Sequence, residues 1–467
     1  MSRGVGIRLG IVLAWFVVLG IVGWLITTRS DPETHADIVE HYKYGSIGAE
    51  GRSGVPASLW LALPEVFPDL LPKGPGQGYE RVGLLYEKGK QRPIGTSFRE
   101  AEIGMVGLNC AVCHVGSLRA SNDAPRQIIL GMPANQFNLQ AYLNFLRATG
   151  KDERFNADTL IPAIKRVDAD FSRADELLYR HYVIPRTRAA LRKLNDDFAW
   201  LDVRPTEGPG RVDTFNPYKV ILGISTGKTV GTSDLPSLWH QRPREGMQLH
   251  WDGNNDSVAE RNVSAAIGAG ASADSLDTDA LERVKDWILD LKAPRYPRER
   301  IDSDLAAQGA GIYAENCASC HSFKGSRVGK VTPINAIGTD RERLDSFTTE
   351  LVKRQGEGNE NLPKFSHFRP TATPTSRWTA SGCAPRTCTT APCRRSRTCS
   401  SRPISAPTSS TAASTSTTGS ASGSSPAARP RSASASSSTR ASAATATAAT
   451  RTARTCPRAR SVPSSST

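Results

Sequence analysis

Cys110-Ala111-Val112-Cys113-His114 decides how this chain is interpreted, because the same pattern returns as Cys317-Ala318-Ser319-Cys320-His321. Both stretches read Cys-x-x-Cys-His, the attachment signature of c-type haem. Two thiols three positions apart lie on one helical turn, where each can form a thioether to a haem vinyl group. The adjacent histidine then lies beneath the iron and supplies its proximal imidazole. The alternative is a zinc site that pools four thiolates, but it leaves both histidines without a role.

The two motifs therefore predict two covalently bound c-type haems. Cys110, Cys113, Cys317 and Cys320 are the expected thioether positions, and His114 and His321 are the expected proximal iron ligands. These four cysteines are the only ones before residue 370, so no structural disulfide is expected in that part of the chain.

The positive charge of the chain is concentrated at one end. The full sequence carries a formal net charge of +14, which taken alone suggests nucleic acid or an anionic surface as a partner. Residues 370–467 hold 13 arginines and no lysine, aspartate or glutamate, which leaves 46 basic against 45 acidic residues elsewhere. Because the body is nearly neutral, we expect no nucleic-acid partner.

The first 30 residues predict a membrane anchor. Leu9–Ile26 is an uninterrupted run of 18 apolar or glycine residues, just long enough to cross the hydrocarbon core as a helix. Arg3 and Arg8 precede the run, and positive charge on that side places the N-terminus in the cytoplasm. A cleaved signal peptide is the alternative, but no Ala-x-Ala site follows the run. In both cases the body is expected in the periplasm, and an uncleaved run ties it to the inner membrane.

The pattern between the anchor and the basic end alternates between glycine- and proline-rich stretches and helical periodicity, with almost no strand signal. Helices are expected within residues 135–202, over 278–291, and over 305–317 leading into the second motif. We expect a mainly α fold with two cytochrome c-like haem lobes and long loops, an N-terminal transmembrane helix and a disordered C-terminal tail. The expected domains are an anchor (1–30), a first haem lobe with a helical insertion (31–295), a truncated second cytochrome c domain (296–369) and a low-complexity tail (370–467).

The composition of the tail has a second interpretation. Its 98 residues contain no leucine, phenylalanine, tyrosine, aspartate, glutamate or lysine, and such a composition cannot bury a core. These residue types are also what GC-rich coding DNA yields in the wrong reading frame. Back-translating Trp378 through Arg395 and shifting by one base gives LDGIWLRAPYLHNGAVPT, a sequence of globular character. We therefore predict a frameshift near residues 369–374.

With the shifted text included, the chain resembles the bacterial di-haem cytochrome c peroxidase and MauG superfamily, in the branch of the rubber-oxygenase-like cytochromes. The resemblance rests on GLNCAVCHVG, GPGRVDTFNPYK (Gly208 to Lys219), ENCASCH and the Pro-Ser-Leu to Trp-Asp-Gly element within Asp234 to Asn262. It covers roughly residues 40–369 as written. The second haem motif would be followed by a Pro-Tyr-Leu-His-Asn-Gly element that only the other frame supplies, which makes an internal duplication.

The sixth ligands of the two irons are less defined by the sequence. His250 lies in the Trp-Asp-Gly element, and the resemblance implies that it faces a haem, so it is the first candidate, with Met247 and His240 after it. An ordinary buried histidine is the alternative for His250. Arg211 is a candidate partner for a haem propionate, because a guanidinium pairs with a carboxylate through two parallel hydrogen bonds. A plain surface arginine is the alternative there.

Three functions remain open from the sequence. The resemblance implies a membrane-anchored di-haem cytochrome with peroxidase- or MauG-type redox chemistry at one haem, which would make it an oxidoreductase. A pure electron carrier with both irons six-coordinate is the second possibility, and a haem-dependent oxygenase of the rubber-oxygenase type is the third. All three need an electron-transfer partner, either a redox protein or a quinol-linked donor. An iron with an open coordination position separates the first and third from the second.

Overall fold

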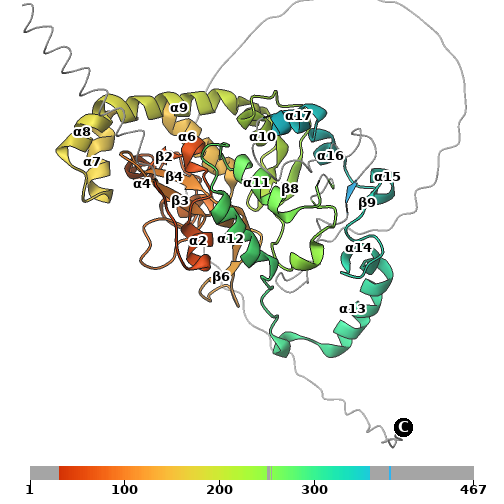
Figure 1. Cartoon of the computed structure of the whole chain (residues 1–467). Coiled ribbons are helices and arrows are strands. Elements are labelled where there is room, and N and C mark those ends of the chain that lie inside the picture. Colours follow the sequence, from red (N-terminus) through yellow and green to blue (C-terminus); the bar gives the residue numbers. More distant parts are fainter. Residues whose placement is uncertain (1–30, 250–252, 254, 358–377, 380–467) are drawn as a thin grey trace, which may run out of the picture. The chain divides into compact units, whose positions relative to one another are not determined.

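A computed structural model describes residues 31–249, 253, 255–357 and 378–379 of the chain. Two compact units are distinguished, residues 1–393 and 394–467, and every described residue belongs to the first (Figure 1). The expected anchor at residues 1–30 and nearly all of the expected tail at 370–467 lie outside the described residues. Within the described ranges, no helix is long and apolar enough to cross a membrane.

An antiparallel sheet of four short strands leads directly to the first Cys-x-x-Cys-His motif. Its order is β1 (Asp31–Pro32), β3 (Thr96–Glu100), β4 (Met105–Leu108) and β2 (Val55–Pro56). The central pair β3 and β4 is in register through Phe98 opposite Val106. Because β4 ends at Leu108, the paired strands fix the direction in which the chain enters the motif.

Three smaller sheets complete the strand content of the described residues. The hairpin of β5 (Val115–Leu118) and β6 (Gln127–Leu130) starts at the residue after His114, with Val115 opposite Leu130. The others pair β7 (Arg211–Asp213) with β8 (Thr232–Asp234), and β9 (Val331–Thr332) with β10 (Trp378–Thr379). The first motif is therefore held between two sheets, one before it and one after it.

Most of the other described residues with regular structure are in helices. The helices up to residue 203 are α2 (Ile38–Tyr44), α3 (Glu50–Ser53), α4 (Ala57–Val66), η1 (Gly78–Val82), α5 (Cys110–His114), α6 (Leu139–Lys151), α7 (Ala157–Val167), α8 (Arg173–Leu178), η2 (Tyr179–Val183), α9 (Ile184–Asp197) and η3 (Ala199–Val203). The later ones are α10 (Phe215–Ile221), η4 (Arg242–Arg244), α11 (Val258–Gly268), α12 (Thr278–Leu289), η5 (Arg298–Arg300), α13 (Ser303–Asn316), α14 (Ala318–His321), α15 (Ile334–Ile337), α16 (Glu342–Ser346) and α17 (Thr349–Glu357).

The expected helices are present close to their predicted positions. α6 begins after Asn138, whose side chain accepts a hydrogen bond from the Ala141 backbone N–H, and such a cap satisfies an otherwise unpaired donor. α12 begins after Asp277 in the same way and buries Leu281, Val284 and Ile288 along one face. Sequence periodicity therefore predicted these helices correctly, because both their caps and their buried faces are encoded locally.

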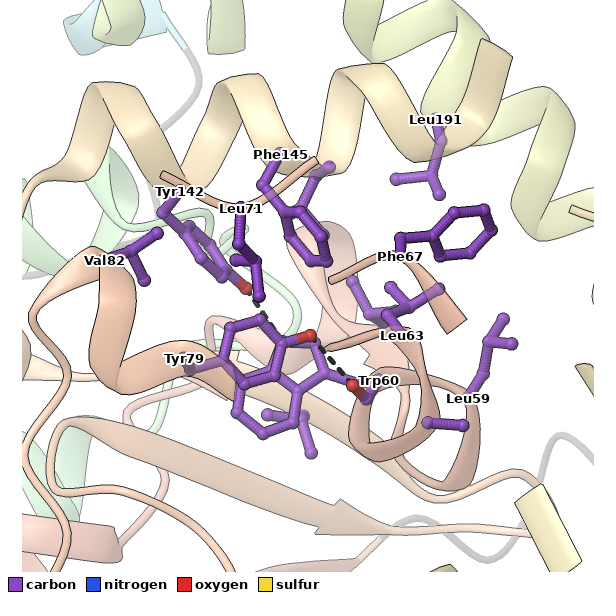
Figure 2. Packing of buried hydrophobic residues seen from close by; sticks show 14 of the residues in the cluster. Leu59, Trp60, Leu63, Phe67, Leu71, Tyr79, Val82, Tyr142, Phe145 and Leu191 are labelled. Atoms are coloured by element: carbon purple, nitrogen blue, oxygen red, sulfur yellow. Dashed lines mark hydrogen bonds between the residues drawn. The ribbon is translucent and has the colours of Figure 1, made fainter. Parts of the chain in front are cut away.

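The largest buried cluster lies where α4, α6 and α7 pack together. Trp60 is fully buried and stacks on Tyr79 with ring centroids 4.1 Å apart. Its indole Nε1 donates to the Tyr142 hydroxyl at 3.0 Å, and the Tyr79 hydroxyl donates to the Trp60 carbonyl at 2.8 Å (Figure 2). Phe145 and Leu63 line the same cluster. Burial of these large side chains gives the region a rigid base, since interiors pack as densely as organic crystals.

The mainly α expectation is wrong in its treatment of strands. About 48% of the described residues are helical and about 10% lie in strands, and these strands form four sheets. The strands were missed because they are only two to five residues long, too short to show an alternating pattern. β1 and β2 each contain a proline, a residue that normally argues against a strand. The predicted transmembrane helix falls on residues 1–30, outside the described residues.

Candidate haem sites

The first motif forms the short helix α5, which spans Cys110–His114. Asn109 caps it: the side-chain oxygen accepts from the Ala111 backbone N–H at 3.0 Å, and the amide nitrogen donates to the Gly45 carbonyl at 3.0 Å. Asn109 is itself buried. Gly95, at φ +89°, packs so closely that an added Cβ would overlap the backbone of Val112. These contacts position both thiols and the imidazole on one turn.

The His114 imidazole is oriented by a backbone carbonyl far along the chain. Its Nδ1 lies 2.9 Å from the Pro236 oxygen. Because a carbonyl only accepts hydrogen bonds, Nδ1 carries the proton and Nε2 has the free lone pair that a metal requires. Burial lowers the pKa of His114 to about 4, so the ring is neutral at pH 7. A neutral, oriented imidazole is the form that binds iron.

The two thiols of the first motif lie in apolar surroundings. Burial raises the pKa of Cys110 to about 11 and that of Cys113 to about 12. Both are free cysteines that are half-buried. Cys113 packs against the Trp60 cluster and Cys110 against the cluster that contains Phe215 and Ile267. Apolar walls on both sides fit the porphyrin edge and its vinyl groups, so the residues present are compatible with a c-type haem.

Arg261 is a functional candidate that the sequence did not single out. It lies in α11, whose Val263, Ala266 and Ile267 pack in the same cluster as Cys110. Its positive charge lowers the pKa of both Cys110 and His114, as a smaller contribution beside the effect of burial. No spacing rule marks this arginine in the sequence, because its relation to the motif exists only after α11 packs against α5.

The second motif is built differently. α13 ends at Asn316, and α14 carries Cys320 and His321, with Cys317 between the two helices. No residue of α13 or α14 is buried in the described structure. The expected helix leading into this motif is therefore present, but the packing around it is much thinner than around the first motif.

The loop after the second motif contacts the segment 240–248. The His240 ring lies 5.9 Å from the Phe323 ring, and the Arg244 guanidinium lies 5.6 Å from the same ring. The Gln248 backbone N–H donates to the Gly329 carbonyl at 3.0 Å. His240 has a φ of +55°, the only positive value at a non-glycine residue in the described part of the chain. Met247 packs against Gly329. Two of the three candidate sixth ligands therefore lie near the second motif.

Arg211 and His250 are the remaining candidates from the sequence. Arg211 is exposed in β7, where its Nε lies 3.1 Å from the Asp234 carboxylate. Among the described residues, its ion pair is therefore with Asp234 and not with a residue of either motif. His250 lies outside the described residues. Among the described residues, no group of three or more His, Cys, Asp or Glu side chains could hold a metal ion, so the four thiols do not meet in a zinc cage.

Comparison with known proteins supports the second motif. Residues 304–378 match the family described as cytochrome C oxidase, cbb3-type, subunit III. This stretch contains α13, α14 and the Cys-x-x-Cys-His motif at 317–321. The chain therefore carries a c-type cytochrome domain, with the haem binding and electron transfer that such a domain provides. The match ends at residue 378 and does not include the first motif, and it gives no support for the peroxidase and MauG superfamily.

One curated relative contributes little more. The uncharacterized protein y4iM of Sinorhizobium fredii (strain NBRC 101917 / NGR234) is 28% identical over 111 residues, which is 24% of this chain. The chain spans only about a quarter of the length of that relative. No solved structure matches the chain.

Proposed function

We propose that this chain is a c-type cytochrome with two covalently bound haems, one at each Cys-x-x-Cys-His motif, and that electrons pass through both. The observation that carries the proposal is the His114 geometry: Nδ1 is 2.9 Å from the Pro236 carbonyl, which leaves Nε2 free to bind iron. A zinc-cage thiol pair would need no such orientation of the neighbouring imidazole.

The roles of the residues follow from their chemistry. Cys110 and Cys113 would hold the first haem through thioethers, and His114 would be its proximal ligand. Cys317 and Cys320 would hold the second, with His321 beneath it. A bound haem supplies one-electron chemistry at its iron. The protein's own contribution is to orient each imidazole, to exclude water from one ring face and to fix the distance to the neighbouring redox group.

We propose further that one haem has an open coordination position and performs peroxidase-type chemistry. Support comes from the first site, where burial keeps His114 neutral and where two apolar clusters flank the thiols. A five-coordinate iron in such surroundings could bind a peroxide. Met132 packs against Gly116, two residues after His114, and its thioether would have to stay off the iron for the coordination position to remain open.

A pure electron carrier is the second candidate, and the second motif favours it. His240 and Met247 both contact the loop that follows His321. Imidazole and thioether are the two side-chain groups that complete a six-coordinate, electron-transferring haem. If both irons acquire such a ligand, the protein only relays electrons.

A single experiment separates the two candidates. The full chain is produced with haem attachment machinery, the covalent haem per chain is counted, and visible spectra are recorded in reduced form before and after carbon monoxide. Two haems, one of which binds carbon monoxide, support peroxidase-type chemistry. Two haems with no response to carbon monoxide identify an electron carrier, and fewer than two haems contradict the proposal.

We also propose the periplasm as the compartment and a redox protein or a quinol-linked donor as the partner. Residues 1–30, which would direct export, lie outside the described residues. The body has nearly balanced charge, so an electron-transfer partner would meet it through a small, transient surface rather than through a strongly charged one. Cell fractionation with detection of the haem-carrying chain tests the compartment: recovery in the cytoplasm would contradict it.

A further inference from the structure

Arg261 is a half-buried cation that has no acidic partner in the part of the chain that the structure describes. Its Nη1 donates to the Gln241 side-chain oxygen at 2.9 Å, and its Nη2 is 3.5 Å from the Asn262 side-chain oxygen. Both acceptors are neutral amides, and within the described ranges no carboxylate forms an ion pair with Arg261. Neighbouring arginines differ: Arg211 pairs with Asp234 and Arg242 with Asp290. A guanidinium that has lost water without gaining an anion is destabilised.

The position of Arg261 relates it to the first motif. Gln241, which accepts its hydrogen bond, is 2% exposed and belongs to residues 236–241, a segment named here the strap. The strap begins with Pro236, whose carbonyl accepts from His114. Trp239 fixes it by donating from Nε1 to the Leu130 carbonyl at 2.8 Å. One short segment therefore contacts the imidazole at one end and the Arg261 guanidinium at the other.

The helix that carries Arg261 approaches the motif from a second direction. Val263 and Ile267 of α11 belong to the cluster against which Cys110 packs. The Arg261 guanidinium therefore extends from α11 to the strap. Both α11 and the strap contact α5. Burial lowers the pKa of Arg261 to about 10, which still leaves it fully charged at pH 7. Among the described residues, the site is a fixed positive charge that lacks a counterion.

We propose that Arg261 binds a propionate carboxylate of the haem attached at Cys110 and Cys113. This inference rests on the proposed function, because it requires a haem at the first motif. A carboxylate is the anion that a guanidinium binds through two parallel hydrogen bonds. Haem supplies carboxylates on the ring edge that bears its propionates, and the bond to Gln241 holds the guanidinium in place before the haem arrives. Arg261 is then a binding residue for the cofactor.

The contact has a measurable electrical consequence. A positive charge close to a haem disfavours the more positive, oxidised iron, and it also neutralises the propionate. Replacing Arg261 by an uncharged residue removes both effects, so the oxidised form becomes more stable and the midpoint potential of the first haem falls. The second haem, held at residues 317–321, should keep its potential and serves as an internal standard.

The experiment is a spectroscopic redox titration of the full haem-loaded chain. Arg261→Gln should raise the ratio of oxidised to reduced first haem, measured at the wild-type midpoint, by roughly threefold to tenfold, where tenfold corresponds to 59 mV. Arg261→Lys keeps the charge and should recover most of the wild-type ratio. Arg242→Gln removes an exposed, ion-paired cation that directly follows the strap, and it should change the ratio little, because solvent screens it.

A second measurement separates a propionate contact from mere proximity. The bending mode of the propionate groups, recorded by resonance Raman spectroscopy, should shift in Arg261→Gln and not in Arg242→Gln. An unchanged first-haem potential, or a changed potential with an unshifted propionate mode, overturns the inference. Arg261→Met, which keeps an unbranched stem, repeats the test if the glutamine variant does not fold. A wild-type chain without haem at Cys110 and Cys113 would instead refute the proposed function.

Discussion

Replacing Asn109 by alanine removes the cap of the helix that carries the first motif. α5 has only five residues, and a helix this short cannot persist without external contacts. Asn109 supplies two of them from a buried position: one to the Ala111 backbone N–H and one to the Gly45 carbonyl. The substitution therefore affects the local geometry of the thiols and the imidazole together.

The expected loss of stability follows from these two bonds. Loss of an asparagine cap costs about 1 kcal/mol. The Gly45 carbonyl would lose its donor inside the protein, and an unsatisfied buried polar group costs about 1–3 kcal/mol. Asn109→Ala should therefore lower the free energy of unfolding by about 2–4 kcal/mol, when the two contributions are added.

Asn138→Ala is the matched control, because Asn138 caps α6 through one bond to the Ala141 N–H. It should cost only about 1 kcal/mol. Urea unfolding, followed by tryptophan fluorescence, measures both losses, and haem-stained gels measure haem attached at the first motif in variants that lack the second pair of thiols. Asn109→Ala should reduce that stain and Asn138→Ala should not. Equal stability losses in the two variants, with equal staining, would show that the cap does not support the motif.

Three further outcomes are expected. Replacing Cys110 and Cys113 by alanine should remove about half of the covalent haem stain, and unchanged staining would contradict attachment at the first motif. Burial raises the pKa of Glu260 to about 7 from 4.5, and neither of its carboxylate oxygens has a hydrogen-bond partner among the described residues. The protonated carboxyl of Glu260 therefore leaves stability intact below pH 4.5, and stability is lost as pH rises through 7 and the group ionises. Glu260→Gln should be more stable than wild type by about 1–3 kcal/mol at pH 8 and nearly equal to it at pH 4. Thermal unfolding at both pH values measures this, and equal stability of the two proteins at pH 8 would contradict the prediction. Tyr142→Phe leaves the buried Trp60 N–H without its acceptor and should lower the free energy of unfolding in urea by about 1–3 kcal/mol. A decrease below about 0.5 kcal/mol, which is typical of surface substitutions, would mean that another acceptor takes over.

The helices of this chain could be predicted because their signals are local. The expected helix at 278–291 corresponds to α12 at Thr278–Leu289, and the helix expected at 305–317 corresponds to α13 at Ser303–Asn316. In each case a capping aspartate precedes the helix. Cap and periodicity both lie within a dozen residues, so no knowledge of distant contacts is needed.

The sheets could not be predicted because distant residues create them. β2 pairs with β4 across about fifty residues, with Val55 opposite Val106, and neither strand is long enough to show alternation. Pairing over such a distance depends on tertiary contacts rather than on local preference. The prediction of a mainly α fold therefore missed the four-stranded sheet, which fixes the direction in which β4 leads into the first motif.

The residues of the candidate site also differ in whether their signal is local in the sequence or depends on tertiary packing. The thiols and imidazoles could be proposed from the sequence because the haem chemistry fixes their spacing. Arg211, in a glycine- and proline-rich stretch, was the candidate partner for a haem propionate, whereas its side chain pairs with Asp234 at the surface. Arg261, the residue that we propose for this role, is brought toward the first motif only by the packing of α11 against the Cys110 cluster.

The bond between His114 and Pro236 joins residues 122 positions apart, which has a consequence for the order of folding. A contact across so long a loop forms late, since the chain entropy of loop closure must first be overcome. The thiols at 110 and 113 can become available while the downstream chain is still incomplete, but the imidazole has no fixed direction until residue 236 has arrived. A nascent chain shorter than this would hold the reactive thiols of its first motif without a defined axial base.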